Sequence, residues 1–302
     1  MPPEVRESRR SSSLRFKPTD EVLDGYLRCA PLAHALHRAA EAHQLAKIPL
    51  AGPVLDLGCG SGQFASLALE GHIDVGVDVD ARALGKAART GRYGEVRCAD
   101  AAQLPFADEQ FQTVLAVSVL EHLTQPALAL AEAFRVLRPG GRFIATIVLV
   151  DLHEYLYYPR MLRYFGAVGL ANGYCRLQDH LLQHRTLLSR SRWQEQFRAA
   201  DFQTFAARPI VTPQLTATWD RLLLSALPYR LGWPYGWHPR WFRNLAVSRY
   251  RQGVRERTDE GSNLLVVARK PSLTRQRMQP ESRPLWTIRN AKETVSHAYA
   301  QS

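Results

Sequence analysis

Short apolar runs alternate with stretches of helical spacing through the middle of the chain. The runs are rich in Val, Leu and Ile, and they end in Gly, Asp or Ser, a pattern typical of buried strands. Short buried strands separated by helices indicate a parallel sheet covered on both faces, so the expected fold class is α/β with a doubly wound sheet. The pattern predicts strands at 53–58, 73–79, 94–100, 112–118 and 141–150, and helices at 62–70, 80–90 and 126–138.

The flanking regions are less regular. Thr19 or Asp20 is expected to cap a helix, and Pro31 should break or kink it. Residues 151–188 have a helical and aromatic pattern, and a further helix is expected to be entered through Ser191. The remaining strands are expected at 202–210 and 263–270.

Composition indicates one globular domain with polar ends. The chain has 302 residues, 46% of them hydrophobic, enough for a sizeable core. Residues 1–18 are expected to be a disordered basic tail and 271–302 a polar tail, which leaves 19–270 as the domain. The apolar stretch 143–150 is too short to span a bilayer, and the N-terminus has no apolar signal core, so we expect a cytoplasmic protein. The four cysteines include no C-x-x-C pair, which argues against a zinc ribbon or a disulfide framework.

Positive charge is concentrated in the second half of the chain. The net charge is +11, but residues 1–150 carry −1 and residues 151–302 carry +12. A basic half of this kind could contact anionic lipid headgroups, RNA or an acidic substrate, and a solvated basic surface is the simpler alternative.

Candidate site residues follow the predicted strands at their carboxyl ends, where ligands of such sheets bind. The first strand runs into Asp56-Leu57-Gly58-Cys59-Gly60, whose glycines let the backbone approach a ligand closely and whose acid could accept from a cationic amine or brace the turn. Asp78 ends the second strand, where a carboxylate can accept from both hydroxyls of a ribose. Asp100 and Ala101 end the third strand and suit an adenine edge, while the fourth strand ends at 117–122 and would face the reacting end of the ligand.

This order of motifs resembles the class I S-adenosylmethionine-dependent methyltransferases, in the group that includes the quinone-biosynthesis methyltransferases. The matching blocks are VLDLGCGSG, GVDVDARAL, CADAAQLPFADEQF, SVLEHL and RVLRPGGRF, which together cover residues 53–143. The resemblance implies a Rossmann-like, seven-stranded, mostly parallel sheet whose last strand, 263–270, runs antiparallel. It also implies S-adenosyl-L-methionine as the cofactor and a methyltransferase domain over 19–270, with residues 50–150 as the cofactor-binding core.

Carried over position by position, the resemblance gives each candidate a part of the cofactor. Gly58, Cys59 and Gly60 would contact the methionine part, with Asp56 in the acidic position of that motif. Asp78 would hold the ribose, Asp100 and Ala101 would hold the adenine, and Val117 would form the wall beside the sulfonium. The sequence departs from the family pattern at Gln112, where an acid is common, and at Asp80, where a small hydroxyl residue is frequent.

Three other functions fit parts of the sequence. A nicotinamide-dependent oxidoreductase also has a glycine turn with an acid about twenty residues later, but its G-x-G-x-x-G fingerprint is broken by Gln63. An RNA-binding methyltransferase would use the basic half of the chain, although no RNA-binding module is recognisable and nucleic acid is therefore disfavoured. The third is a non-catalytic cofactor-binding partner protein.

The acceptor is expected to be a small molecule covered by two insertions, 151–188 and 213–260. Both insertions interleave aromatic residues with Arg, as surfaces at a membrane interface do, which suggests a lipophilic or membrane-associated acceptor and peripheral membrane contact. A lid packed on the core explains the same pattern without a membrane.

Methyl transfer needs a general base only when the acceptor carries a proton on a poor nucleophile. His122 and His184 are the candidate catalytic residues. No metal is expected: Ser118 stands at the first position of the metal-holding E-x-x-E-H of some relatives, and the i, i+4 pair His180 and His184 has no evident third ligand.

Overall fold

The computed structural model describes residues 14–223, 240–255 and 258–272. The chain divides into two units, Met1–Lys270 and Pro271–Ser302, and every element named below belongs to the first.

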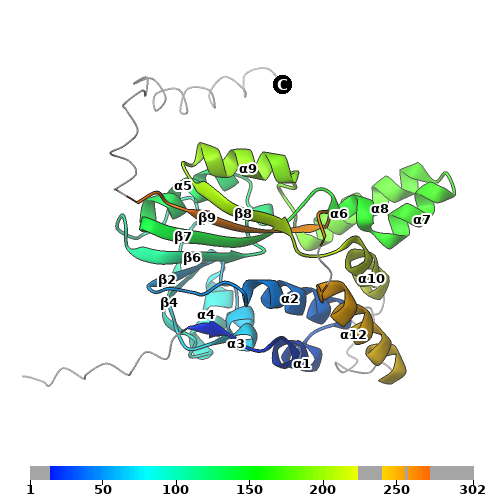
Figure 1. Ribbon diagram of the computed structural model, residues 1–302, viewed down its shortest axis with the longest axis horizontal. Helices are drawn as coiled ribbons and strands as arrows, with labels where there is room; N and C mark the ends of the chain where they lie inside the picture. The colour runs from blue at the N-terminus through cyan, green and yellow to red at the C-terminus, as the bar shows by residue number, and fades with distance from the viewer. Residues whose placement is uncertain (1–13, 224–239, 256–257, 273–302) are drawn as a thin grey trace, which may run out of the picture. The chain divides into compact units, whose positions relative to one another are not determined.

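A seven-stranded sheet in the order β5-β4-β2-β6-β7-β9-β8 forms the centre of this unit (Figure 1). Neighbouring strands from β5 to β7 are parallel, whereas β9 pairs antiparallel with both β7 and β8. The predicted mostly parallel sheet with an antiparallel last strand is therefore confirmed. The strands are β2 (Val54–Leu57), β4 (Ile73–Asp78), β5 (Tyr93–Cys98), β6 (Phe111–Val117), β7 (Leu137–Val148), β8 (Gln203–Pro209) and β9 (Asn263–Arg269).

Helices cover both faces of the sheet because alternate side chains of each buried strand point to opposite faces. Val114 of β6 packs with α5 (Pro126–Val136) and α9 (Arg190–Ala199), while its neighbour Leu115 packs with α2 (Leu32–Leu45), α10 (Pro213–Leu223) and α12 (Arg240–Arg255). The shorter elements include α1 (Thr19–Cys29), α3 (Gln63–Ala68), α4 (Ala81–Arg89), the 3₁₀ turn η1 (Leu120–His122), and the small pair β1 (Arg15–Phe16) and β3 (Leu69–Glu70).

An insertion of three helices leaves the sheet after β7. It comprises α6 (Leu152–Tyr155), α7 (Tyr157–Tyr164) and α8 (Val168–Leu182). In Figure 1, α7 and α8 form a hairpin that extends away from the sheet. The two ends of the insertion meet, because the N–H of Val150 donates to the carbonyl oxygen of Leu188 at 3.2 Å.

Three local predictions are corrected. Regular structure begins before residue 19, since β1 pairs antiparallel with β3. The helix α9 is capped by Ser189, whose Oγ accepts from the N–H of Arg192, and not by Ser191, because a capping side chain must precede the first helical turn. His180 and His184 do not share a helix face, because α8 ends at Leu182 and Gln183 adopts a left-handed conformation.

No helix among the described residues combines the length and the apolar composition needed to cross a bilayer.

Candidate functional site

A cavity of about 400 Å³ lies at the carboxyl ends of β2 and β6. Its lining joins the glycine turn after β2 to residues of α2, η1, the insertion and α10. Most of the sequence-predicted site residues meet here, namely Asp56, Gly58, Cys59, Gly60, Val117, His122 and His184.

The glycine turn is shaped by backbone hydrogen bonds to the next strand. The N–H groups of Gly58 and Cys59 both donate to the carbonyl oxygen of Val77, at 2.8 and 2.9 Å. Gly58 has φ +72°, and a Cβ atom there would approach Val119 to 2.6 Å. Because neither condition suits another residue, glycine is required at position 58 for the turn to lie against η1.

Asp56 is a buried carboxyl held by a tyrosine from another strand. The hydroxyl of Tyr93 donates to Oδ2 of Asp56 at 2.7 Å. The ring of Tyr93 reaches it across β4, where a Cβ atom on Gly76 would meet the ring at 2.8 Å. Burial raises the pKa of Asp56 to about 7, partly offset by the Tyr93 hydrogen bond and by the charge of Arg38. A cation bound beside Asp56 would favour its charged form.

Asp78 and Asp80, two residues apart, do different work. The carboxylate of Asp78 accepts from the N–H of Gly60 at 2.8 Å and from the N–H of Asp80 at 2.9 Å, so it ties the end of β4 to the glycine turn. Asp80 instead caps α4, accepting from the N–H groups of Arg82 and Ala83. The cap explains an acid at position 80 without any ligand.

Asp100 and Ala101 lie outside the cavity lining. Asp100 is exposed and accepts from the N–H of Ala102 at 2.8 Å, which stabilises the turn after β5. Ala101 is buried in the main hydrophobic cluster. The adenine-binding role expected for both residues stays a prediction.

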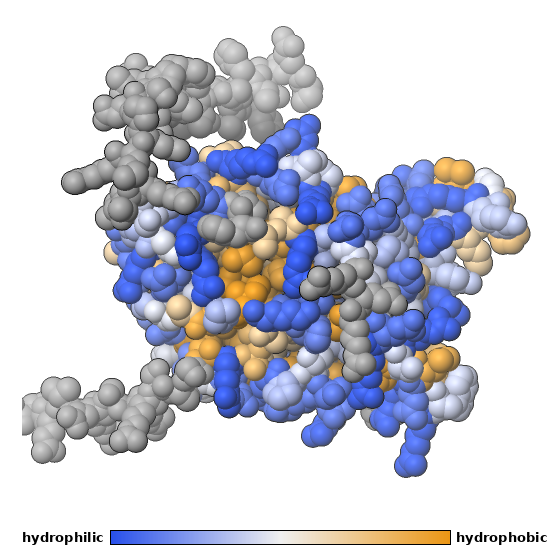
Figure 2. Space-filling model, viewed as in Figure 1, coloured by the Kyte–Doolittle hydropathy of each residue, from blue (hydrophilic) through white to orange (hydrophobic). Residues whose placement is uncertain are grey.

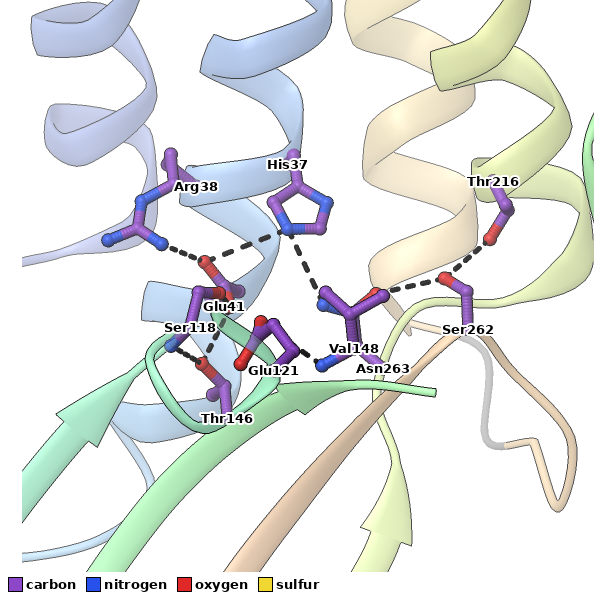
Figure 3. Close-up of polar contacts among 10 residues, drawn as sticks. All are labelled: His37, Arg38, Glu41, Ser118, Glu121, Thr146, Val148, Thr216, Ser262 and Asn263. Atoms are coloured by element: carbon purple, nitrogen blue, oxygen red, sulfur yellow. Dashed lines mark hydrogen bonds and ion pairs between the residues drawn. The ribbon is translucent and has the colours of Figure 1, made fainter. Parts of the chain in front are cut away.

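One face of α2 contributes a polar cluster that the sequence reasoning missed (Figure 3). Glu41 is fully buried; its Oε2 accepts from Arg38 at 2.6 Å, and its Oε1 accepts from the hydroxyls of Ser118 and Thr146, each at 2.6 Å. Burial raises the pKa of Glu41, but Arg38 and these donors more than offset it, so the net pKa is lowered. The signal was present as polar residues at helical spacing, His34, His37, Arg38 and Glu41.

Glu121 of η1, another buried carboxyl, lines the cavity and has a different environment from Glu41. Its Oε1 accepts from the N–H of Val148 at 3.2 Å, while its Oε2 is buried without a hydrogen-bond partner among the described residues. Burial, with a smaller contribution from the negative charge of Glu41, raises the pKa of Glu121 to about 8.

His122 and His184 lie side by side at the cavity, with ring centroids 5.7 Å apart. Nδ1 of His122 contacts the carbonyl oxygen of Gln183 at 3.1 Å, and Nδ1 of His184 contacts Asp179 at 3.0 Å. Burial lowers the pKa of His184. Within the described part of the chain, no cluster of His, Cys, Asp or Glu could hold a metal ion.

Residues of both insertions expected to cover the acceptor line the cavity. Leu152 and Leu182 of the first insertion and Thr216 and Trp219 of the second line the cavity. Four of the aromatic residues that gave the second insertion its pattern lie outside the described residues, namely Tyr229, Trp233, Tyr235 and Trp237.

Comparisons with known proteins agree with this architecture. Residues 55–145 match a family model described as a methyltransferase domain. A ubiquinone/menaquinone biosynthesis C-methyltransferase of Desulfotalea psychrophila is 36% identical over 101 residues, which cover 32% of this chain and 41% of that protein. The chain spans about half the length, or less, of the curated relatives it matches.

Solved structures share the fold at low identity. A methyltransferase of Thermotoga maritima titled as a possible histamine N-methyltransferase has a TM-score of 0.52 at 20% identity, covering 79% of this chain and 92% of that one. A structure titled as a [4+2]-cyclase has a TM-score of 0.51 at 20% identity, covering 86% of this chain and 100% of that one. Residues 55–145 thus match a methyltransferase domain, and the seven-stranded sheet has the fold of the solved methyltransferase structure.

Proposed function

We propose that this protein transfers the methyl group of S-adenosylmethionine to a small molecule with a large apolar part. The observation that supports the proposal most directly is the single cavity that joins the glycine turn of residues 58–61 to the end of β6. A methyl donor on the turn and an acceptor under the insertion helices would share this cavity. In-line methyl transfer mainly requires such positioning and the exclusion of water.

The chemistry of the lining fits the amino acid end of the cofactor. Asp56 offers a carboxyl to an ammonium group, and Arg38 of α2, which also lines the cavity, offers a guanidinium to a carboxylate. Tyr26, whose buried hydroxyl has no hydrogen-bond partner among the described residues, lines the same space. A buried polar atom left unpaired is costly, so a polar ligand is the natural partner for it.

Asp78 is the proposed ribose ligand. When bound, the cofactor supplies a methyl group on a positively charged sulfur. The residues of this chain bind it, hold the acceptor in line and keep water away. Val117, which is 8% exposed at the end of β6, provides an apolar wall without a competing nucleophile.

The proposed acceptor is lipophilic because the acceptor side of the cavity has apolar walls. Val148, Leu152, Leu182, Val211 and Trp219 line it together with a few polar groups. Pockets of this composition bind an apolar body and orient it through a small number of hydrogen bonds.

The insertion that walls the cavity also carries an exposed apolar surface, which supports peripheral contact with a membrane. We call it the α7–α8 surface; Tyr164 and Phe165 at its tip are 85% and 75% exposed, and Figure 2 shows hydrophobic side chains at this end of the hairpin. Residues 155–178 contain three Arg and no Asp or Glu. Aromatic and aliphatic side chains between Arg residues suit an anionic lipid surface. The surface comprises Arg160, Met161, Arg163, Tyr164, Phe165, Val168, Leu170, Arg176 and Leu177.

Calorimetric titration with S-adenosylmethionine, and separately with NADH, tests the central proposal. We expect micromolar binding of S-adenosylmethionine and no binding of NADH. Binding of NADH in its place would favour the oxidoreductase alternative, and binding of neither would refute the proposed cofactor site.

A further inference from the structure

Glu121 lines the cavity with a carboxyl oxygen that forms no hydrogen bond to the described residues. Its side chain is fully buried, and its Oε1 is fixed by the N–H of Val148. Its Oε2 has no partner among the described residues, although Glu121 lines the cavity. A buried carboxyl oxygen without a partner at a ligand cavity points to a partner supplied by the ligand.

The position of Glu121 is set by the backbone on both sides of the cavity. Its own carbonyl oxygen accepts from the N–H groups of Arg185 and Thr186, at 2.8 and 3.0 Å, in the segment that follows α8. Glu121 also lies four residues beyond Val117, on the turn that closes the end of β6. The carboxyl is therefore held on the acceptor side of the proposed methyl donor.

Of the other buried carboxyls here, Asp56 is held by Tyr93 and is the proposed partner of the cofactor's ammonium group, and Glu41, behind the cavity lining, is already occupied. Glu41 is paired with Arg38 and accepts from two hydroxyls, so it has no oxygen left for a ligand. Of the two histidines, His122 is exposed, and Nδ1 of His184 contacts Asp179. The unpartnered oxygen of Glu121 is the better placed group.

We propose that Glu121 accepts the proton of an acidic acceptor hydroxyl, phenolic or enolic, as that hydroxyl is methylated. This inference rests on the proposed methyl transfer and names its substrate class. The acceptor oxygen forms a bond to the methyl carbon, the carbon–sulfur bond breaks with its electron pair on sulfur, and the hydroxyl proton passes to Oε2 of Glu121. No further reactant is needed for the step to balance.

The choice of an acidic hydroxyl follows from matching the acid strengths of donor and base. Proton transfer is most effective when the base is close in pKa to the group that it deprotonates. Glu121, raised to about 8, lies within about two units of a phenol such as tyrosine. An aliphatic alcohol is far too weak an acid for this base. A cationic amine would find little negative charge here at neutral pH, since most of the carboxyl is protonated.

The pH dependence of the site involves every ionisable group that lines the cavity. The titratable and charged residues come from four parts of the chain. Those of α1 and α2 are Tyr26, His34, His37 and Arg38, with Glu41 behind them. The others are Asp56 and Cys59 at the glycine turn, His122 in η1, and His184 after α8. The contribution of Glu121 is therefore isolated by comparison with Glu121→Gln, which keeps the shape and the hydrogen bond from Val148.

Infrared spectroscopy tests the proposal without a known acceptor. We expect the wild-type protein at pH 6 to show a protonated carboxyl band that is absent from Glu121→Gln and disappears in the wild type as the pH rises past about 8. A 4-alkylphenol should shift this band, because its hydroxyl and the protonated carboxyl form a hydrogen bond. The matching 4-alkyltoluene, which has no oxygen to bond with the carboxyl, should not. The exposed Glu195→Gln serves as the matched control and should keep the band.

The kinetic arm uses radiolabelled S-adenosylmethionine with the same phenol and a matched 4-alkylaniline. We expect methylation of the phenol, a rate that rises with pH to about 8, and a loss of about 100-fold in kcat for Glu121→Gln with the pH dependence removed. Transfer to the aniline alone, an unchanged pH profile in Glu121→Gln, or a carboxyl band indifferent to the phenol would overturn the proposal. Calorimetric titration with S-adenosylmethionine is carried out on both proteins. Absence of binding to the wild type would refute the proposed function and not the role of Glu121 alone.

Discussion

At the scale of single residues, Asp78 and Asp80, two positions apart, bind different backbone groups, and only Asp78 is a proposed ligand of the cofactor. Asp78 directs one oxygen to the N–H of Gly60, so its charge lies beside the glycine turn. The side chain of Asp80 caps the first turn of α4 by accepting from two of its N–H groups. Substitution of the two acids should therefore affect different properties of the protein.

We expect Asp78→Asn to weaken S-adenosylmethionine binding by about 10- to 100-fold, because a charge-assisted hydrogen bond contributes about 1.5–3 kcal/mol. Asp80→Ala should leave the affinity nearly unchanged and lower the free energy of unfolding by about 1 kcal/mol, as the loss of a helix cap does. Calorimetric titration and urea denaturation of both variants measure the two effects. Equal loss of affinity in both variants would contradict the assignment of Asp78 to the ribose.

Gly76 supports the site from a distance, since it leaves room for the Tyr93 ring that holds Asp56. We expect Gly76→Ala to lower the free energy of unfolding by about 1–3 kcal/mol through overpacking. Gly85→Ala, in the middle of α4 with open space around it, is the matched control and should stabilise the protein by about 0.5–1 kcal/mol. Thermal or urea unfolding distinguishes the two, and similar changes in both would contradict the close approach described here.

At the scale of elements, α2 and η1 hold two buried carboxyls in opposite states: Glu41 lies behind the cavity lining, and Glu121 is part of it. Arg38 comes from the same helix as Glu41 and stabilises its negative charge. Glu121 has no cation of its own, and the negative charge of Glu41 further raises its pKa. Environments that move two acids apart in this way are typical of sites that handle protons.

This difference predicts how stability depends on pH. The ordinary pKa of Glu121 is 4.5, and the folded value is about 8, so between these pH values the native state binds a proton that the unfolded state does not. Its contribution to stability is full below pH 4.5 and is lost as the pH rises toward 8, by at most about 1.4 kcal/mol per pH unit. We expect Glu121→Gln to remove this slope, as measured by urea unfolding from pH 5 to pH 8.5.

Other groups with shifted pKa values share part of that pH range and act in both proteins; besides Asp56 and His34 they include His37, His184 and Asp220. The pKa of Asp56 is raised to about 7, so its contribution to stability falls with rising pH, as that of Glu121 does. Burial lowers the pKa of His34 to about 4, so its contribution rises with pH below pH 6.5. These contributions cancel in the difference between the wild type and Glu121→Gln. A difference that does not vary with pH would mean that Glu121 is charged in the folded protein.

The exposed aromatic residues of the α7–α8 surface predict binding to anionic membranes. We expect the wild-type protein to co-sediment with anionic vesicles, and replacement of both Tyr164 and Phe165 by Ser to weaken this binding at least about tenfold, because each buried aromatic side chain contributes about 1.5–3 kcal/mol. Leu128→Ser, a 48% exposed position on α5, should bind like the wild type. Self-association of the protein that is abolished by the Ser substitutions, without vesicle binding, would instead identify this surface as a contact between copies.

At the scale of the whole molecule, periodicity and motif order predicted the sheet, its helices and the glycine turn. These are local properties: alternating burial sets the strands, and a tight turn demands glycine. The cluster on α2 was missed because nothing in a single helix shows which buried element its polar face will meet. Glu41 accepts hydrogen bonds from Ser118 and Thr146, which are 77 and 105 residues away in the chain, so its role is not visible from the helix alone.

The limits of sequence reasoning are also visible in the acids. The family pattern favoured Asp78 over Asp80 as the ribose ligand; the structure shows that Asp80 caps α4, while the ligand role of Asp78 stays a prediction. Glu121 was considered only within the segment 117–122, expected to face the reacting end of the ligand, and as part of an incomplete metal motif. Its burial and its unpartnered oxygen depend on Val148 and on the segment after α8, contacts that no spacing rule contains.

The hydrogen bond between Val150 and Leu188 closes the base of the helical insertion with the two ends of that segment in contact. A segment whose ends meet can change in length or sequence without altering the distance that the rest of the chain must bridge. Selection could therefore have replaced or extended these helices repeatedly while the sheet and the glycine turn stayed as they are. The same joint offers a natural boundary for grafting the insertion of one such protein onto the sheet of another.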